Sequence, residues 1–172
     1  PMTGGSSVDT NLWRKVASYD EVIDRVHTVL STHKQMLIEE LIEGDEITVA
    51  VLSGAALPVI EIIPPQDEEF DYENKYNGKT QELCPPLHIS EDMQQLASTQ
   101  AELIHTTLGC NELSRTDFMV SKNQKLYVLE TNTLPGMTDA SLFPKAANTN
   151  RLSMLELCDK IVKDAVARYS AA

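Results

Sequence analysis

A predicted β-hairpin within residues 115–132 constrains the fold of this chain more than any other feature of its sequence. Residues 115–120 and 125–131 are rich in strand-forming side chains, and a short polar turn separates them. Charged or amide side chains occupy alternate positions in both runs, at Arg115 and Asp117 in the first and at Glu130 and Asn132 at the end of the second. Such alternation is typical of strands with two chemically different faces.

The register of this hairpin decides which polar groups meet. We expect Met119 to pair with Val128, which would bring directly opposed side chains to Cβ separations of about 5 Å. In that register the remaining residues of this face pair as Asp117 with Glu130 and Arg115 with Asn132. The opposite face would be apolar and would pack on a helix through Phe118, Val120, Tyr127 and Leu129.

Two carboxylates and an amide oxygen on one patch suit Mg²⁺, which binds through a few carboxylates together with substrate phosphates. The alternative is a solvated, salt-bridged hairpin face, since surface ion pairs are common. The hairpin alone leaves both interpretations open. The segment after Asn132 favours a ligand site, because Gly136 allows backbone amides to approach a bound group closely.

Capping signals and apolar spacing predict the other elements. Ser18 opens a predicted helix over residues 19–32, and Ser90 and Ser153 open two later helices. The strands Ile47–Leu52 and Pro58–Ile63 form a predicted hairpin through residues 53–56, and a short helix is expected near Ser141. Tight hairpins favour an antiparallel sheet with helices on one side, which is the α+β class.

Helical spacing also predicts the buried side of the two later helices. For the helix after Ser90, which should end at Gly109, the expected buried residues are Met93, Leu96, Ala97, Leu103, Ile104 and Leu108. For the last helix they are Leu155, Cys158, Ile161, Val162, Ala165 and Val166.

Charge and cysteine content exclude several classes of protein. The 172 residues carry a net charge of −12 without a basic cluster, which argues against a nucleic-acid or anionic-membrane partner. No apolar stretch is long enough to span a bilayer. The three cysteines form no C-x-x-C pair and are expected to be reduced thiols of a cytoplasmic protein. The four histidines share no ligand spacing.

The chain closely resembles the C-terminal catalytic region of D-alanine–D-alanine ligases, members of the ATP-grasp superfamily. The resemblance is carried by SRTDFMV at 114–120 and KLYVLETNTLPGMTDASLFPKAA at 125–147. It extends through GGSSV at 4–8, LIEELIEGDEITVAVL at 37–52 and FDYENKY at 70–76, in family order. It implies an ATP-grasp fold in which residues 1–39 are a remnant of the central subdomain and 40–172 are the C-terminal subdomain.

The resemblance implies roles at the hairpin and the loop that follows it. Asp117, Glu130 and Asn132 would be ligands of two Mg²⁺ ions, or Mn²⁺, that bridge the phosphates of ATP. Arg115 would stabilise an acyl phosphate and a tetrahedral intermediate, with the Gly136 amide beside it.

The resemblance also implies residues that bind ATP. Glu39, Glu40 and Leu41 would belong to the hinge strand that hydrogen-bonds adenine, and Glu46 would hold the ribose. Ser6 would lie on a loop that closes over the phosphates, and Lys75 and Tyr76 on a mobile lid that excludes water.

The substrates and partners follow from the same resemblance. ATP and two D-alanine molecules would react, with the carboxylate of the second D-alanine held at Ser141 and Leu142, in cytoplasmic peptidoglycan precursor synthesis. The intact protein would be a homodimer. A ligase for D-lactate or D-serine, and a non-catalytic nucleotide-binding module, are the alternatives.

The N-terminal sequence leads to a further expectation. The loop at residues 1–8 has no strand before it, and two phosphate-gripping lysines of the family do not occur in the chain. We expect a C-terminal piece of a longer protein that cannot ligate on its own.

Overall fold

The computed structural model describes residues 16–64 and 80–170. The chain divides into two compact units, Pro1–Ile42 with Pro64–Thr80 and Glu43–Ile63 with Gln81–Ala172. The expected subdomain boundary after residue 39 stays a prediction. Among the described residues, no helix combines the length and apolar character needed to cross a bilayer.

In the first unit the described structure centres on one helix, α1, at Tyr19–Thr32. The Ser18 hydroxyl accepts a hydrogen bond from the Glu21 amide, and the Glu21 carboxylate accepts one from the Ala17 amide. Both amides would otherwise lack a partner at the helix start. The predicted helix and its cap are confirmed. Residues 35–43, which contain the expected hinge strand, form neither helix nor strand.

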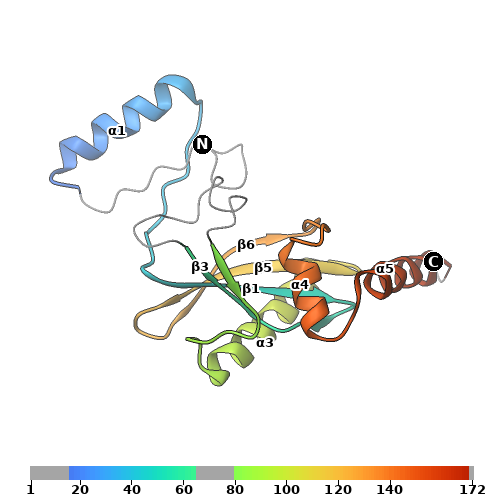
Figure 1. Cartoon of the computed structure of the whole chain (residues 1–172). Helices are drawn as coiled ribbons and strands as arrows, with labels where there is room; N and C mark the ends of the chain where they lie inside the picture. The colour runs from blue at the N-terminus through green and yellow to red at the C-terminus, as the bar shows by residue number, and fades with distance from the viewer. Residues whose placement is uncertain (1–15, 65–79, 171–172) are drawn as a thin grey trace. The chain divides into compact units, whose positions relative to one another are not determined.

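The second unit is built on an antiparallel sheet (Figure 1). The strands follow the order β4-β3-β1-β5-β6, with β2 added at the end of β1, and all described pairings are antiparallel. Their bounds are Gly44–Leu52 for β1, Ala55–Ala56 for β2, Ile60–Ile63 for β3, Gln81–Leu83 for β4, Leu113–Ser121 for β5 and Leu126–Asn132 for β6.

The turn between β1 and β2 consists of two residues with positive φ angles. Ser53 and Gly54 have φ angles of 53° and 82°, and Leu52 pairs with Ala55 on either side of them. A two-residue turn with positive φ at both positions matches the right-handed twist of its strands. The predicted hairpin is confirmed, but its turn is shorter than expected, because Ala55 and Ala56 form strand β2.

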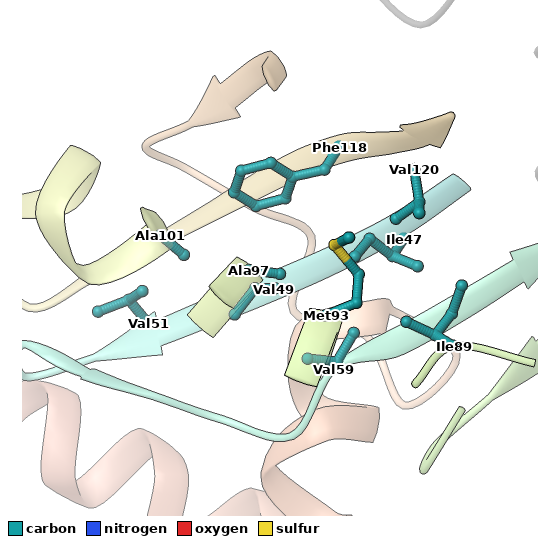
Figure 2. Packing of buried hydrophobic residues seen from close by; sticks show 10 residues of the cluster. All are labelled: Ile47, Val49, Val51, Val59, Ile89, Met93, Ala97, Ala101, Phe118 and Val120. Atoms are coloured by element: carbon teal, nitrogen blue, oxygen red, sulfur yellow. The ribbon is translucent and has the colours of Figure 1, made fainter. Parts of the chain in front are cut away.

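The helices of this unit, α3 at Glu91–Thr107, α4 at Leu142–Thr149 and α5 at Met154–Ser170, cover both faces of the sheet. Figure 2 shows the cluster in which Ala97 and Ala101 of helix α3 pack with sheet residues such as Phe118. Helices α4 and α5 pack on the opposite face, against Ala50 and Ile60. The α+β class is confirmed. The expectation that the helices lie on one side of the sheet is wrong, because β1 presents apolar side chains on both of its faces.

The helix starts are as predicted. The Ser90 hydroxyl accepts a bond from the Met93 amide at the start of α3, and Ser153 and Glu156 form the reciprocal capping box of α5. Helix α3 is followed by Gly109, whose φ of +66° suits the left-handed residue after a helix.

The predicted buried stripes are partly wrong. On α3 the buried residues are Met93, Ala97, Ala101 and His105, whereas Leu96, Leu103 and Leu108 are exposed. On α5 only Leu157 is buried, and Leu155, Cys158, Val162 and Val166 are exposed. The small side chains of Ala97 and Ala101 allow α3 to lie close to the sheet. The polar His105 can be buried there because its ring forms a hydrogen bond with Ser114 Oγ at 2.7 Å.

Candidate active site

The predicted polar pairs lie side by side on strands β5 and β6. Asp117 is opposite Glu130 and Arg115 is opposite Asn132. On the other side of β5, Thr48 of β1 is opposite Asp117. The side chains of Thr48, Asp117 and Glu130 therefore form a row across the sheet, on the face that α4 packs against farther along β1.

The pairing changes beyond this row, because a β-bulge interrupts the ladder between Asp117 and Phe118. Phe118 pairs with Val128, so Leu129 is the extra residue of β6 and the expected pairing of Met119 with Val128 is wrong. Val128 and Leu129 are about half exposed. The packed residues of the apolar face are Phe118, Val120 and Leu126. The expected packing of Tyr127 and Leu129 on this face is wrong, because the bulge places Tyr127 opposite Met119.

The carboxylate of Asp117 is buried and fully engaged. Arg115 donates from Nε to Oδ1 and from Nη2 to Oδ2, both at 2.9 Å. The Thr48 hydroxyl donates a further bond to Oδ1. Asp117 is 6% exposed and Thr48 is 1% exposed, so the three groups hold one another in a place that bulk water barely reaches.

The surroundings of Arg115 are strongly acidic. Burial alone would lower the pKa of its guanidinium, but the bonds to Asp117 and the negative charges of Asp117, Glu130 and Glu46 raise that pKa above its ordinary value. Glu46 lies on β1 opposite Met119, on the same face. Arg115 is a fixed cation among three carboxylates.

The loop after β6 is ordered by its own polar side chains. Asn132 Oδ1 accepts a bond from the Leu134 amide at 2.9 Å. The Ser141 hydroxyl accepts from the Thr138 amide and contacts the Thr138 hydroxyl at 2.9 Å, so it is turned toward the loop rather than toward α4. Gly136 lies against the Ser141 side chain, and a Cβ atom added at Gly136 would come within 2.8 Å of Ser141 Oγ, too close for any other residue without a shift of Ser141.

The structure does not place some of the predicted residues relative to this site. Glu39, Glu40 and Leu41 belong to the first unit, which is described separately. Ser6, Lys75 and Tyr76 lie outside the described residues.

Thr48 is the site residue that sequence reasoning missed. It interrupts an apolar stretch at two residues from Glu46, so the two share a face of β1. A hydroxyl on the carboxylate-bearing face of a buried strand is the signal that could have identified it.

The donor set suits a metal shared with a substrate. In residues 16–64 and 80–170 there is no cluster of three or more histidine, cysteine, aspartate or glutamate residues that could hold an ion by itself. Asp117, Glu130 and Asn132 offer carboxylate and amide oxygens, which fit a Mg²⁺ ion that takes its other ligands from phosphates and water. They do not form a closed protein cage.

Comparison with known proteins places this fold in a class. The chain superposes on the crystal structure of the D-alanine–D-alanine ligase of Bacillus anthracis complexed with ATP, with a TM-score of 0.72 and 33% identity over 91% of this chain and 51% of that one. The VanG D-Ala:D-Ser ligase of Enterococcus faecalis gives a TM-score of 0.68 at 26% identity, over 85% of this chain and 43% of that one. The fold is that of the C-terminal subdomain of ATP-grasp ligases.

Sequence comparison defines the family. The family model described as "D-ala D-ala ligase C-terminus" matches residues 1–163. The ligase of Carboxydothermus hydrogenoformans is 40% identical over 152 residues, and that of Syntrophobacter fumaroxidans is 39% identical over 168 residues. These matches cover 86% and 95% of this chain but 48% and 52% of the relatives, so the chain spans about half of their length. The chain belongs to the D-alanine–D-alanine ligase family and corresponds to its C-terminal portion.

Proposed function

We propose that this chain is the part of a longer D-alanine–D-alanine ligase that binds Mg²⁺-ATP and carries the charged centre of the reaction. The whole protein would phosphorylate the carboxylate of one D-alanine with ATP, and the amine of a second D-alanine would then displace phosphate. The observation that carries the proposal is the Thr48–Asp117–Glu130 row with Arg115 beside it.

The acidic residues of the row would bind the metal. Asp117, Glu130 and Asn132 would hold Mg²⁺, or Mn²⁺, through their side-chain oxygens. When bound, the metal supplies positive charge to the phosphate oxygens of ATP. Two such ions are part of the proposal.

Arg115 would bind the transferred phosphoryl group. A guanidinium presents paired N–H donors whose geometry matches carboxylate and phosphate alike. Its bidentate contact with Asp117 fixes its position before any ligand binds, so little reorganisation is needed at the charged centre. The backbone amide of Gly136 would add a donor beside it.

The remaining residues would bind the other parts of the substrates. Glu46 would hold the ribose, and Glu39, Glu40 and Leu41 would bind adenine. The carboxylate of the second D-alanine would lie at Ser141 and Leu142, where α4 begins and its free backbone amides favour an anion.

The closing parts of the site complete the proposal. Ser6 would contact the phosphates, and Lys75 and Tyr76 would cover them and exclude the water that would hydrolyse an acyl phosphate. We also propose that the intact protein is a homodimer that acts in the cytoplasm. One structural neighbour is a D-Ala:D-Ser ligase, so the second substrate is tested by offering D-alanine, D-serine and D-lactate to the intact protein.

Calorimetric titration of Mg²⁺-ATP into the chain tests the proposed site. We expect metal-dependent binding that weakens at least about tenfold in Asp117→Asn and in Glu130→Gln, because each loses a charged metal ligand. Asp92→Asn, which removes a carboxylate from the first turn of α3, is the matched control and should bind as the wild type does. Equal affinities in all four proteins would refute the site.

A further inference from the structure

Thr138 holds the side chain of Ser141, the residue at which the second substrate is proposed to bind. The Thr138 amide donates to Ser141 Oγ at 3.1 Å, and the hydroxyl oxygens of the two residues lie 2.9 Å apart. The Ser141 amide donates in turn to the Thr138 carbonyl oxygen at 2.8 Å. Thr138 therefore contacts Ser141 through both its backbone and its hydroxyl.

The Ser141 hydroxyl is not used to cap α4. A serine just before a helix ordinarily accepts a bond from the second or third amide of that helix. Ser141 makes no such bond with its side chain. The third residue of α4 is Pro144, which has no N–H to donate. The hydroxyl is therefore available for another partner.

The hydrogen-bond capacity of the two hydroxyls limits what Ser141 can do. A serine hydroxyl has one hydrogen to donate and two lone pairs that accept. The Thr138 amide occupies one of these lone pairs. When the Thr138 hydroxyl donates as well, it occupies the second lone pair, and the hydrogen is all that Ser141 has left to offer. The reverse direction would turn that hydrogen to Thr138 and leave a lone pair for the ligand.

Gly136 restricts the same oxygen further. A Cβ atom at Gly136 would come within 2.8 Å of Ser141 Oγ and 3.5 Å of Ser141 Cβ, so the backbone of Gly136 lies against this side chain. Contacts with Gly136 and Thr138 together fix the place of the Ser141 oxygen. What a ligand can still change is the direction of the Ser141 hydrogen.

We propose that Thr138 is a positioning residue for the substrate carboxylate: its hydroxyl donates to Ser141 Oγ, and the Ser141 hydrogen is thereby directed to a carboxylate oxygen. An ionised carboxylate only accepts hydrogen bonds, so it favours the state in which Ser141 donates. A hydroxyl that accepts a bond is also a stronger donor, because hydrogen bonds in a chain polarise one another. The inference rests on the proposed function, in which the second D-alanine supplies the carboxylate.

Titration of D-alanine into the isotope-labelled chain, followed by NMR at the Leu142 amide, tests the proposal. Thr138→Val keeps the shape of the side chain but removes the hydroxyl, and should raise the dissociation constant of D-alanine at least about threefold. Thr138→Ser restores a hydroxyl and should bind within about twofold of the wild type. D-alaninamide, which lacks the negative charge, should bind more weakly than D-alanine to the wild type.

Thr149→Val is the matched control. Thr149 is also exposed, and its hydroxyl donates to the Lys145 carbonyl oxygen within α4 at 3.1 Å. Its replacement removes a hydroxyl from the same helix without a contact to Ser141, so D-alanine should bind as it does to the wild type. Thermal unfolding of both valine variants checks that neither loses its fold.

The possible failures are distinguishable. Equal affinity of the wild type and Thr138→Val would overturn the role of Thr138 and leave the proposed function intact. A loss that Thr138→Ser does not restore, or that Thr149→Val shares, would assign Thr138 a structural role only. A Leu142 amide that does not respond to D-alanine in the wild type would refute the carboxylate site itself, and with it this inference.

Discussion

Arg115 holds the carboxylate of Asp117, two residues away on the same strand, with two bonds of equal length, Nε to Oδ1 and Nη2 to Oδ2 at 2.9 Å. The side chains are 13% and 9% exposed. Each charge therefore depends on the other for its compensation, since removal of one partner leaves a buried charge without a counterion. The stability of the unit should therefore depend on both charges of this pair.

Replacement of Arg115 by methionine should make folding depend on metal. We expect Arg115→Met to lower the free energy of unfolding by about 3 kcal/mol without Mg²⁺, because Asp117 stays buried and unpaired. Added Mg²⁺ should recover more stability in the variant than in the wild type, since the ion replaces the lost charge. Thermal unfolding with and without Mg²⁺ measures both effects.

Arg168→Met is the control, because Arg168 pairs with Glu112 at the surface. It should cost less than about 1 kcal/mol and show no added response to Mg²⁺. If Mg²⁺ shifts the melting temperature of Arg115→Met and wild type equally, the link between Asp117 and the metal is wrong.

Thr48 is expected to position Asp117 for its ligand. Thr48→Val removes the hydroxyl that bonds Asp117 Oδ1 and should lower stability by about 1 to 2 kcal/mol. It should also weaken Mg²⁺-ATP binding several-fold. Thr116→Val is the matched variant, since Thr116 is equally buried but lies on the opposite face and bonds Thr131. It should lose similar stability and keep its affinity, and equal losses of affinity would contradict the positioning role.

The buried carboxylate of Glu61 should make stability depend on pH. It accepts bonds from the amides of Leu87 and His88 and from the His88 ring at 2.8 Å. Burial would raise the pKa of Glu61, but these bonds outweigh it and lower the pKa below its ordinary value. A lowered native pKa stabilises the fold above the unfolded value of about 4.3, and the gain is lost as the pH falls through the native pKa.

We therefore expect Glu61→Gln to cost about 1 to 3 kcal/mol at pH 6 and progressively less below about pH 4. Urea unfolding monitored by circular dichroism over this range measures the difference. Glu91→Gln, at the exposed start of α3, should change stability by only a few tenths of a kcal/mol. A cost of Glu61→Gln that is constant with pH would show that the charge of Glu61 is not what matters.

The attachment of α5 should depend on one side chain. Leu157 is fully buried against α4, whereas Leu103 of α3 is exposed. Leu157→Ala should lower the free energy of unfolding by about 2 to 5 kcal/mol, and Leu103→Ala by less than about 0.5 kcal/mol. Similar costs for the two variants, measured in urea, would contradict the described packing of α5.

The chain by itself should not form a peptide bond. About half the length of the relatives has no counterpart in it, and we expect the first D-alanine and part of the ATP phosphates to be held there. Phosphate release with ATP and D-alanine should stay at background for this chain, while an intact ligase of the family is active in the same assay. A rate near that of the intact enzyme would overturn this expectation.

The hairpin and its polar row could be predicted because their signal is local. Arg115, Asp117, Glu130 and Asn132 alternate with other residues on two strands joined by a short turn, so a single register brings them together. The bulge at Leu129 could not be predicted, because Leu126 to Leu129 are apolar or aromatic at every position. In such a run, the sequence does not show which side chains point toward the core. Only the packing in the folded sheet shows that Leu126 is among those that do.

Helix starts could likewise be read from the serines that cap them, but buried faces could not. Which side of α3 is buried depends on the small side chains of Ala97 and Ala101, which let the helix approach strands distant in sequence. On α5 apolar residues occur on several sides, so spacing alone does not distinguish Leu157 from Leu155. Thr48 was missed because its partner, Asp117, is 69 residues away.

The bulge at Leu129 has a consequence for the behaviour of this protein at high concentration. Strand β6 ends the described order of the sheet, and Val128 and Leu129 expose apolar surface there. A regular strand of this kind would be a template for the stacking of further molecules into amyloid-type fibrils. The irregular backbone at Leu129 interrupts the repeat of hydrogen-bonding groups that such stacking requires, so the bulge that shifts the register of the β5–β6 hairpin should also disfavour this kind of aggregation.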